Sequence, residues 1–325
     1  MLKEKGMCDN IIQSNVPLKD KNWFKTGGNA AFYAAPKTET EFCQTLQYAQ
    51  RNNLEIFVLG KGANVLISDD GFDGLVIHPH INDIWHEDAD SNYALVHAGA
   101  GADMDHVIEY CLEHNLVGLE ELSGIPGTVG GSVCMNTHYF QFSLSDFLVQ
   151  ATIVDKAGTT SQTVDKNWLQ LGYDTSQLMS QTHYLTHATF KLKKVSPNEA
   201  AFAKGRKTEI IRHRVARYPS KNTCGSFFRN FFDHEVTLPI AGQPNKKMIY
   251  VAYYLDNIGV KGHLTVGDAA VSHQHANMII NKGNATSSDI ANLAKEMQTL
   301  VKKNFNIVPQ PECQLIGFKE YPFVR

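Results

Sequence analysis

The chain contains 325 residues, of which 43% are hydrophobic and 19% are charged. This composition is that of a globular protein with a substantial core, and the length suggests two or three domains. A formal charge of −3 and a pI near 6.5 argue against nucleic acid as the main partner, because binding to a phosphate backbone needs an excess of basic residues. No apolar run approaches the roughly 20 residues that span a bilayer, so no membrane partner is expected.

The start of the chain and its cysteines indicate the compartment. Residues 1–14 are a polar leader that lacks the hydrophobic region of a secretory signal. The six cysteines are far apart and form no CxxC pair: Cys8, Cys43, Cys111, Cys134, Cys224 and Cys313. Neither a disulfide framework nor a metal site of zinc type is expected from them, and we predict a cytoplasmic protein.

The first predicted elements are a helix, a strand and a glycine loop in succession. Thr38 and Glu41 have the spacing of a capping box at the start of an amphipathic stretch, which predicts a helix over residues 38–52. The apolar run 54–59 is predicted to be a strand that stops at a glycine turn beginning at Gly60. This order of elements indicates α/β architecture.

A second cycle of elements follows. We predict a strand over 93–98, a helix over 103–114, a hairpin of strands 151–155 and 159–164, and a strand over 185–192. Ser196, Pro197 and Glu199 then combine a helix cap, a first-turn proline and a capping-box acid. They predict a helix to about Arg214, and we place a domain boundary at its start. The last predicted helix covers 289–304, with Thr286 near its beginning.

Two glycine-rich segments are candidates for ligand binding. Gly60 and Gly62 lie in VLGKGANVLI, where the lack of side chains lets backbone amides approach an anion such as a pyrophosphate. The segment matches neither a GxGxxG nor a GxxxxGK[ST] pattern, and a simple strand–turn–strand would also explain it. The second segment, Gly124 to Gly131, contains four glycines within eight residues. Such a density favours close backbone approach, although turns are also rich in glycine.

Three further motifs carry side chains with possible chemistry. Ser226 lies in CGSFFRN without the GxSxG elbow of a nucleophile, so its hydroxyl is a candidate proton donor; a serine in a turn is the alternative. Glu312, in PQPECQLIGF, is a candidate second proton-handling group, or else a solvated carboxylate. His273 and His275 are two residues apart and would share a face on a strand, but the spacing indicates no third metal ligand.

Taken together, these motifs resemble one family, the UDP-N-acetylenolpyruvoylglucosamine reductases, also called UDP-N-acetylmuramate dehydrogenases. The similar stretches occur in family order and cover about residues 15–318: NWFKTGGNAAFYAAPKTETEF, VLGKGANVLISDDGFDGLVI, AGAGADMDHVIEYCLEHNLVGLEELSGIPGTVGGSVCMN, GSFFRN, GVKGHLTVGDAAVSHQHANMIINKGNATSSDI and PQPECQLIGF. The short connection before GSFF is similar to the subgroup that lacks an extra tyrosine-bearing loop.

The resemblance implies a mixed α+β and α/β fold. An FAD-binding module of the vanillyl-alcohol-oxidase (PCMH) type would cover residues 15–195, with subdomains of about 15–84 and 85–195. A C-terminal α/β substrate-binding domain would cover 196–325. The implied partner is a small-molecule sugar nucleotide, and we expect a monomer or weak oligomer.

The resemblance also implies cofactors and site residues. FAD would be bound by Gly60, Lys61, Gly62, Ala63, Asn64, Val65, Gly124, Ile125, Pro126, Gly127, Gly130 and Gly131. NADPH would reduce it, and the enolpyruvyl sugar nucleotide would then accept the hydride, yielding UDP-N-acetylmuramate for peptidoglycan precursor synthesis. Ser226 matches the family's proton donor and Glu312 its glutamate. The substrate would be bound by Tyr173, Arg214, Arg217, Arg229, Asn230 and His275.

Some positions depart from the family pattern. The family's catalytic arginine lies in GYRxS, whereas this chain has Asp174. A carboxylate there would repel the substrate carboxylate, which at about 4 Å amounts to several kcal/mol. Thr137, His138 and Tyr139 replace a run of small residues, Arg229 replaces a lysine, and Phe231 replaces a proline. We therefore keep three hypotheses: a divergent reductase in which Arg214 or Arg217 supplies the lost cation, a flavin oxidoreductase with another substrate, and a non-catalytic flavin-binding homologue.

Overall fold

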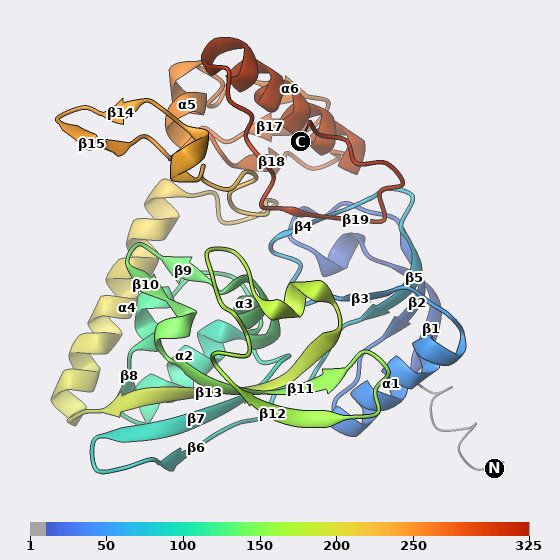
Figure 1. The fold of residues 1–325 in the computed structure, drawn as a ribbon, viewed down its shortest axis with the longest axis vertical. Helices are drawn as coiled ribbons and strands as arrows, with labels where there is room; N and C mark the ends of the chain where they lie inside the picture. The colour runs from blue at the N-terminus through green and yellow to red at the C-terminus, as the bar shows by residue number, and fades with distance from the viewer. Residues whose placement is uncertain (1–10, 325) are drawn as a thin grey trace. The chain divides into compact units, whose positions relative to one another are not determined.

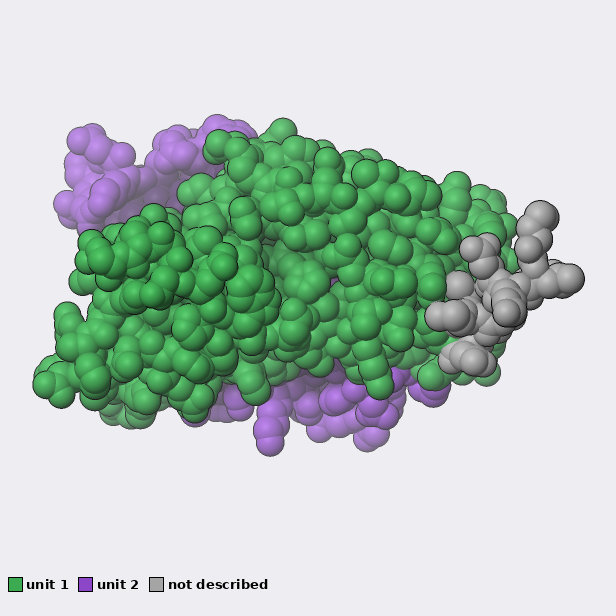
Figure 2. All heavy atoms as spheres, turned by 90° about the horizontal axis from the view of Figure 1, so that it is seen from below, with its two compact units in different colours: residues 1–16, 30–61, 73–214 green, residues 17–29, 62–72, 215–325 purple. Residues whose placement is uncertain are grey.

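The structure is a computed structural model that describes residues 11–324. The chain forms two compact units. Unit 1 comprises the described residues up to 16, with 30–61 and 73–214; unit 2 comprises 17–29, 62–72 and the chain from 215 onward (Figure 2). The predicted functional division at residues 195 and 196 stays a prediction, and ten residues of the predicted leader lie outside the described range.

The first sheet of unit 1 holds the strand that leads into the first glycine segment. Its strands run in the order β1 (Ile12–Pro17), β2 (Asn29–Ala34), β5 (Phe72–Ile77) and β3 (Ile56–Val58), with β3 and β5 parallel. Helix α1 (Glu39–Arg51) packs on it through Phe42, Leu46 and Ala49, which are all fully buried. The Thr38 side chain caps the helix by accepting from the Glu41 amide, which confirms the predicted helix and its start.

The second sheet of unit 1 is antiparallel. Its order is β12 (Ser161–Asp165), β11 (Leu148–Asp155), β13 (His183–Lys194), β7 (Tyr93–Gly99) and β6 (Ile84–Asp88), and β8 (Leu116–Val117) also pairs with β13. Helices α2 (Met104–Glu113) and α3 (Val129–Met135) pack against it, as Figure 1 shows, and share its core. The hairpin β9 (His138–Tyr139) and β10 (Phe142–Ser143) follows α3, and α4 (Pro197–Arg217) follows β13.

Unit 2 is built around a small sheet and a parallel strand pair. The sheet has the order β16 (Thr265–Val266), β17 (Ala269–Val271) and β18 (Ile279–Asn281), and α5 (Val251–Asn257) and α6 (Ser287–Phe305) pack with it. Strand β4 (Val65–Ile67) pairs with β19 (Gln314–Ile316), and β14 (Pro239–Ile240) pairs with β15 (Gln243–Lys247). A capping box of Thr286 and Asp289 begins α6, as the sequence predicts. Short 3-10 turns complete the fold at Lys19–Lys21, Leu119–Leu122, Leu144–Asp146, Gln177–Ser180 and Asp233–Glu235.

Two local predictions need correction. The second glycine segment, for which no helix was predicted, includes the start of one, because Gly130 and Gly131 lie in the first turn of α3, capped by Thr128. Glycine is a poor helix former, and the helix depends on burial of Val129 and Val133 in the core. His273 and His275 lie in the turn between β17 and β18, so they do not share a strand face. None of the helices within residues 11–324 has the length and apolar composition needed to cross a membrane.

Candidate functional site

The two glycine segments meet within unit 1. A Cβ atom added to Gly60, just beyond β3, would lie 2.7 Å from Thr128 Oγ1 and 3.9 Å from the Cα atom of Gly131. The 2.7 Å distance to Thr128 Oγ1 is shorter than the contacts that real Cβ atoms make. Only glycine therefore fits at position 60. Thr128 is itself buried, and its hydroxyl accepts from the Gly131 amide at 3.3 Å. Gly60 of the first glycine segment therefore packs against Thr128, the N-cap of the helix that begins in the second segment.

The start of α2 holds both segments in place. The Asp103 carboxylate forms an ion pair with Lys61 Nζ and also caps α2 by accepting from the Asp105 amide at 3.1 Å. Asp105 Oδ1 accepts from the Gly124 amide at 3.2 Å, and the Met104 amide donates to the Gly127 carbonyl at 3.1 Å. The Lys61 pair is partly exposed, so its contribution to stability is about 1 kcal/mol or less. Sequence reasoning missed this role of Asp103 and Asp105, although an aspartate at a helix start is a recognisable cap.

The first glycine segment continues into unit 2, where it has buried polar neighbours. Gly62 has a φ of +65°, and a Cβ there would lie 2.6 Å from the Asn22 Cα atom. Among the described residues, three buried oxygens in unit 2 have no hydrogen-bond partner: Asn22 Oδ1, Thr26 Oγ1 and Asn64 Oδ1. A buried polar atom without a partner costs about 1–3 kcal/mol. These oxygens therefore fit a bound ligand that brings hydroxyl or N–H donors, and Asn22 and Thr26 were not predicted from the sequence.

Ser226 and Glu312 lie on neighbouring extended segments of unit 2. Phe228 and Pro311 form an antiparallel bridge, and the Glu312 amide donates to the Phe227 carbonyl at 2.9 Å. Ser226 is bridged to Met278 on its other side and, like Glu312, is half-buried. The two predicted proton-handling residues are thus brought together although they are far apart in the sequence.

Asn277 fixes the segment that carries Ser226. Its Nδ2 donates to the Phe228 carbonyl at 2.7 Å, its Oδ1 accepts from the Phe228 amide at 3.1 Å, and its carbonyl accepts from the Phe227 amide at 2.8 Å. The side chain is only 3% exposed. The Asn277 side chain therefore provides hydrogen-bond partners for the amide and the carbonyl of Phe228. Sequence reasoning missed this role.

Two buried thiols flank this pair of residues. Burial raises the pKa of Cys224 well above its ordinary value, and hydrogen bonding with Cys313 raises it further. The thiolate is the nucleophilic form of cysteine, so Cys224 does not act as a nucleophile at neutral pH.

The predicted substrate residues of unit 2 have defined partners. Arg229 donates to both carboxylate oxygens of Glu235 at 2.8 Å, and these hydrogen bonds lower the pKa of the Glu235 carboxyl. Asn230 Oδ1 accepts from the Val251 amide at 3.3 Å, at the start of α5. Burial lowers the pKa of His275, so its imidazole is neutral at neutral pH. Arg217 lies over the ring of Tyr218 at 5.9 Å.

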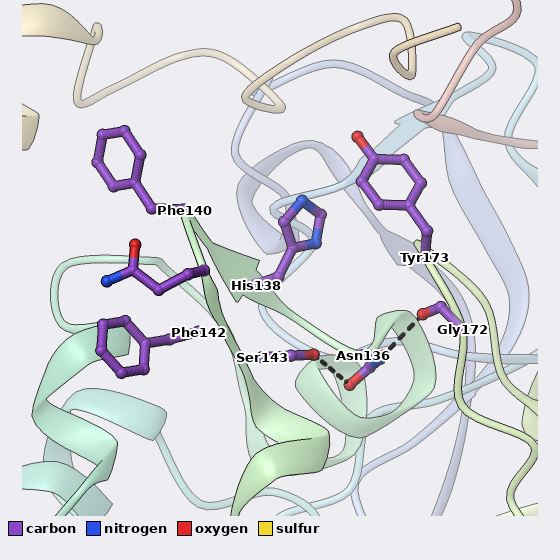
Figure 3. A pocket seen from close by; sticks show the side chains of 8 residues that line it. Asn136, His138, Phe140, Phe142, Ser143, Gly172 and Tyr173 are labelled. Carbon is purple, nitrogen blue, oxygen red and sulfur yellow. Dashed lines mark hydrogen bonds between the residues drawn. The ribbon is translucent and has the colours of Figure 1, made fainter. Parts of the chain in front are cut away.

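Unit 1 contains a cavity of about 230 Å³ (Figure 3). Its lining consists of Asn136, His138, Phe140, Gln141, Phe142, Ser143, Gly172 and Tyr173. Asn136 organises it, because its Nδ2 donates to the Gly172 carbonyl at 2.9 Å and its Oδ1 accepts from Ser143 Oγ at 3.0 Å. Asp174 Oδ1 lies 3.5 Å from Nδ1 of the lining residue His138. Of the predicted substrate residues, Tyr173 lines this cavity; His138 and Asn136 were not predicted.

Arg214, in α4, contacts the second glycine segment. Its Nε donates to the Gly124 carbonyl at 3.1 Å, and its guanidinium lies 4.9 Å from the centre of the Tyr139 ring. A Cβ on Gly124, whose φ is +74°, would meet the Arg214 Cδ atom at 3.4 Å. This cation is therefore part of the glycine segment's own packing.

Comparison with known proteins agrees with both units. Residues 30–163 match the FAD binding domain family, and residues 217–316 match the C-terminal domain family of UDP-N-acetylenolpyruvoylglucosamine reductase. The reductase of that name from Clostridium novyi is 30% identical over 309 residues, covering 94% of this chain and 92% of the relative. The chain belongs to the UDP-N-acetylenolpyruvoylglucosamine reductase family. This confirms the resemblance seen in the sequence motifs.

Other family members extend the comparison. The reductase from Trichormus variabilis is 32% identical and covers 94% of this chain and 86% of its own length. The crystal structure of UDP-N-acetylenolpyruvylglucosamine reductase from Thermus caldophilus is 26% identical, with a TM-score of 0.72 over 93% of this chain and 97% of that one. The expected mixed fold is confirmed, and the reductase is a flavin enzyme that carries FAD.

We expect Asn277→Ala to destabilise unit 2. The substitution leaves the buried amide and carbonyl of Phe228 without partners, at a cost of about 2–4 kcal/mol in the free energy of unfolding. Denaturant unfolding measures this loss. Asn304→Ala, at an exposed helix position, is the matched control and should change stability by less than about 0.5 kcal/mol. Equal stability of both variants would show that Asn277 does not fix the Ser226 segment.

Proposed function

We propose that this reductase catalyses the NADPH-dependent, FAD-mediated reduction of UDP-N-acetylglucosamine enolpyruvate to UDP-N-acetylmuramate. The product is a peptidoglycan precursor, and the protein works in the cytoplasm as a monomer or weak oligomer, without nucleic acid or membrane partners. The observation that carries this proposal is the pairing of the Ser226 and Glu312 segments through Phe227 and Phe228. It brings the segments that carry a hydroxyl and a carboxylate together in the part of the chain matched by the reductase's own C-terminal domain.

Each group has a role in the proposed reaction. FAD, when bound, supplies hydride transfer between NADPH and the sugar nucleotide. Ser226 donates a proton to the enolate carbon of the reduced substrate, and Glu312 assists at the same carbon. The residues 60–65 with 124–127, 130 and 131 hold the cofactor by close backbone approach. Tyr173, Arg214, Arg217, Arg229, Asn230 and His275 bind or orient the sugar nucleotide.

The half-reactions test the proposal. The purified protein should show bound flavin absorbance that NADPH bleaches under anaerobic conditions and that UDP-N-acetylglucosamine enolpyruvate restores. Flavin that is reduced but not reoxidised by this sugar nucleotide would instead indicate a flavin oxidoreductase with another acceptor. A protein that holds no flavin would leave only a non-catalytic role.

Ser226→Ala should separate the two half-reactions. Removing the proton donor should leave flavin reduction by NADPH unchanged and slow reoxidation by the substrate by about 100-fold or more, the range of general acid catalysis. Stopped-flow absorbance under anaerobic conditions measures both rates. Ser161→Ala, at an exposed position of β12, is the control. Equal loss in both half-reactions would contradict the assigned role.

Gly131→Ala tests whether the glycines serve the cofactor. Gly131 is exposed within α3, and a Cβ there would meet nothing closer than 3.5 Å. Alanine should therefore leave the flavin-free protein as stable as before, or more stable by up to about 1 kcal/mol. If the backbone faces FAD, the added methyl should raise the dissociation constant for FAD about tenfold or more. Titration by flavin fluorescence measures it.

Gly205→Ala is the matched control for this variant. Gly205 lies within α4, and a Cβ there would have no neighbour within 4 Å. The same substitution should raise stability there as well but leave the affinity for FAD unchanged. FAD affinity of Gly131→Ala equal to that of this control would remove Gly131 from the proposed cofactor site.

A further inference from the structure

The cavity of unit 1 contains a single ionisable group that can become a cation. Among the described residues that line it, the others are amides, hydroxyls, aromatic rings and a glycine, and His138 alone can carry a positive charge. The His138 side chain is 35% exposed. Its ring lies 4.8 Å from the ring of Tyr173, and Figure 3 shows the two rings beside each other at the cavity. An imidazole and a phenol hydroxyl together form a donor pair suited to an anionic oxygen.

The Asp174 carboxylate orients the His138 ring. Its carboxylate is 12% exposed and lies 3.5 Å from His138 Nδ1, so the Nδ1 side of the ring faces the carboxylate and Nε2 is left for another partner. This is the arrangement in which a carboxylate fixes the tautomer and direction of an imidazole. With Nδ1–H facing the carboxylate, the ring has an N–H donor at Nε2 when it is protonated.

The turn around Asp174 is built to hold that carboxylate in position. Asp174 has a φ of +52°, a left-handed conformation that aspartate adopts more readily than most residues. The Gly172 amide donates to the Thr175 carbonyl at 3.0 Å, and the Asn136 side chain ties the Gly172 carbonyl to the end of α3. The same asparagine binds Ser143 in β10. The turn and the β9–β10 hairpin that carries His138 are therefore joined through one side chain.

We propose that His138, oriented by Asp174, binds the carboxylate of the enolpyruvyl group. The inference rests on the proposed function, since it names a substrate contact of that reaction. The cavity volume of about 230 Å³ is below the roughly 300–1,000 Å³ of sites for whole drug-sized ligands, so it suits a three-carbon acid group better than a nucleotide. Asp174 and His138 both depart from the family pattern, and here they are in contact.

Arg214 is not the cation of this cavity. It is bound to Gly124 and stacked on Tyr139, and neither it nor Arg217 belongs to the lining. The hypothesis that one of these arginines replaces the lost family cation is therefore less well supported than a histidine at the cavity wall. The negative charge of Asp174, which alone would repel a carboxylate, is offset when the His138 ring it contacts is protonated.

The test compares His138→Gln, Asp174→Asn and the double variant in the flavin-loaded protein. With His138→Gln, the concentration of UDP-N-acetylglucosamine enolpyruvate that half-saturates reoxidation should rise about 10- to 100-fold, the loss expected for one charge-assisted hydrogen bond. Flavin reduction by NADPH should stay within about twofold of wild type. His138→Arg, which restores a cation, should recover most of the loss. His106→Gln, at an exposed position of α2, is the matched control.

The double variant shows whether Asp174 acts by positioning His138 or affects substrate binding independently of it. If Asp174 acts through His138, adding Asp174→Asn to His138→Gln should cause little further loss, so that the two effects are non-additive. Additive losses, or wild-type saturation by His138→Gln, would overturn the inference while leaving the proposed function standing. Wild-type reduced flavin that the sugar nucleotide fails to reoxidise would overturn the proposed function and this inference with it.

Discussion

The contact between the Gly60 backbone and the Thr128 side chain is the constraint on which the cofactor half of unit 1 depends. It places the end of β3 against the cap of α3, with no room for a Cβ atom at position 60. The amide of Gly130, two residues after Thr128, donates to the Ala100 carbonyl at 2.8 Å, which ties α3 to the end of β7. Two strand ends and a helix start thus converge, with glycine at the points of closest approach.

Backbone hydrogen bonds, more than surface charges, also build the proposed catalytic pair. The Phe227 carbonyl accepts from the Glu312 amide, while Asn277 satisfies Phe228 from the other side. Buried hydrogen bonds of this kind are costly to break because the partner group cannot turn to water. Exposed ion pairs such as that of Arg212 and Glu209 have little influence by comparison. The proposed proton donor is therefore held by a rigid part of unit 2.

The distribution of charge around the unit 1 cavity explains how an aspartate is tolerated where the family pattern has an arginine. Asp174 contacts a histidine, whereas Arg214 is bound to Gly124 and stacked on Tyr139. A carboxylate that is largely removed from water is stable only when it is paired. The hairpin that carries His138 also departs from the family pattern, so the two departures lie in contact with each other.

The sequence by itself determined the elements whose signals are local. Helices α1 and α6 follow from apolar periodicity and from the residues at their starts, Thr38 and Thr286, and α2 follows from periodicity alone, because a helix start and a helical face are encoded within a few residues. The glycine segments and the family motifs were also readable from residue order alone. Helix α3 was not, because its glycines disfavour a helix, and it is stabilised by the burial of Val129 and Val133 together with the Thr128 cap.

Only the tertiary structure decided which distant residues meet. The pairing of β4 with β19, the clamp of Asn277 on Phe228, and the contact of His138 with Asp174 each join segments that are far apart along the chain. No local pattern encodes such contacts, because they depend on the path of the whole backbone and on which buried groups remain to be satisfied. The sequence named Ser226, Glu312 and Asp174 as the residues of interest, and the fold decided their neighbours.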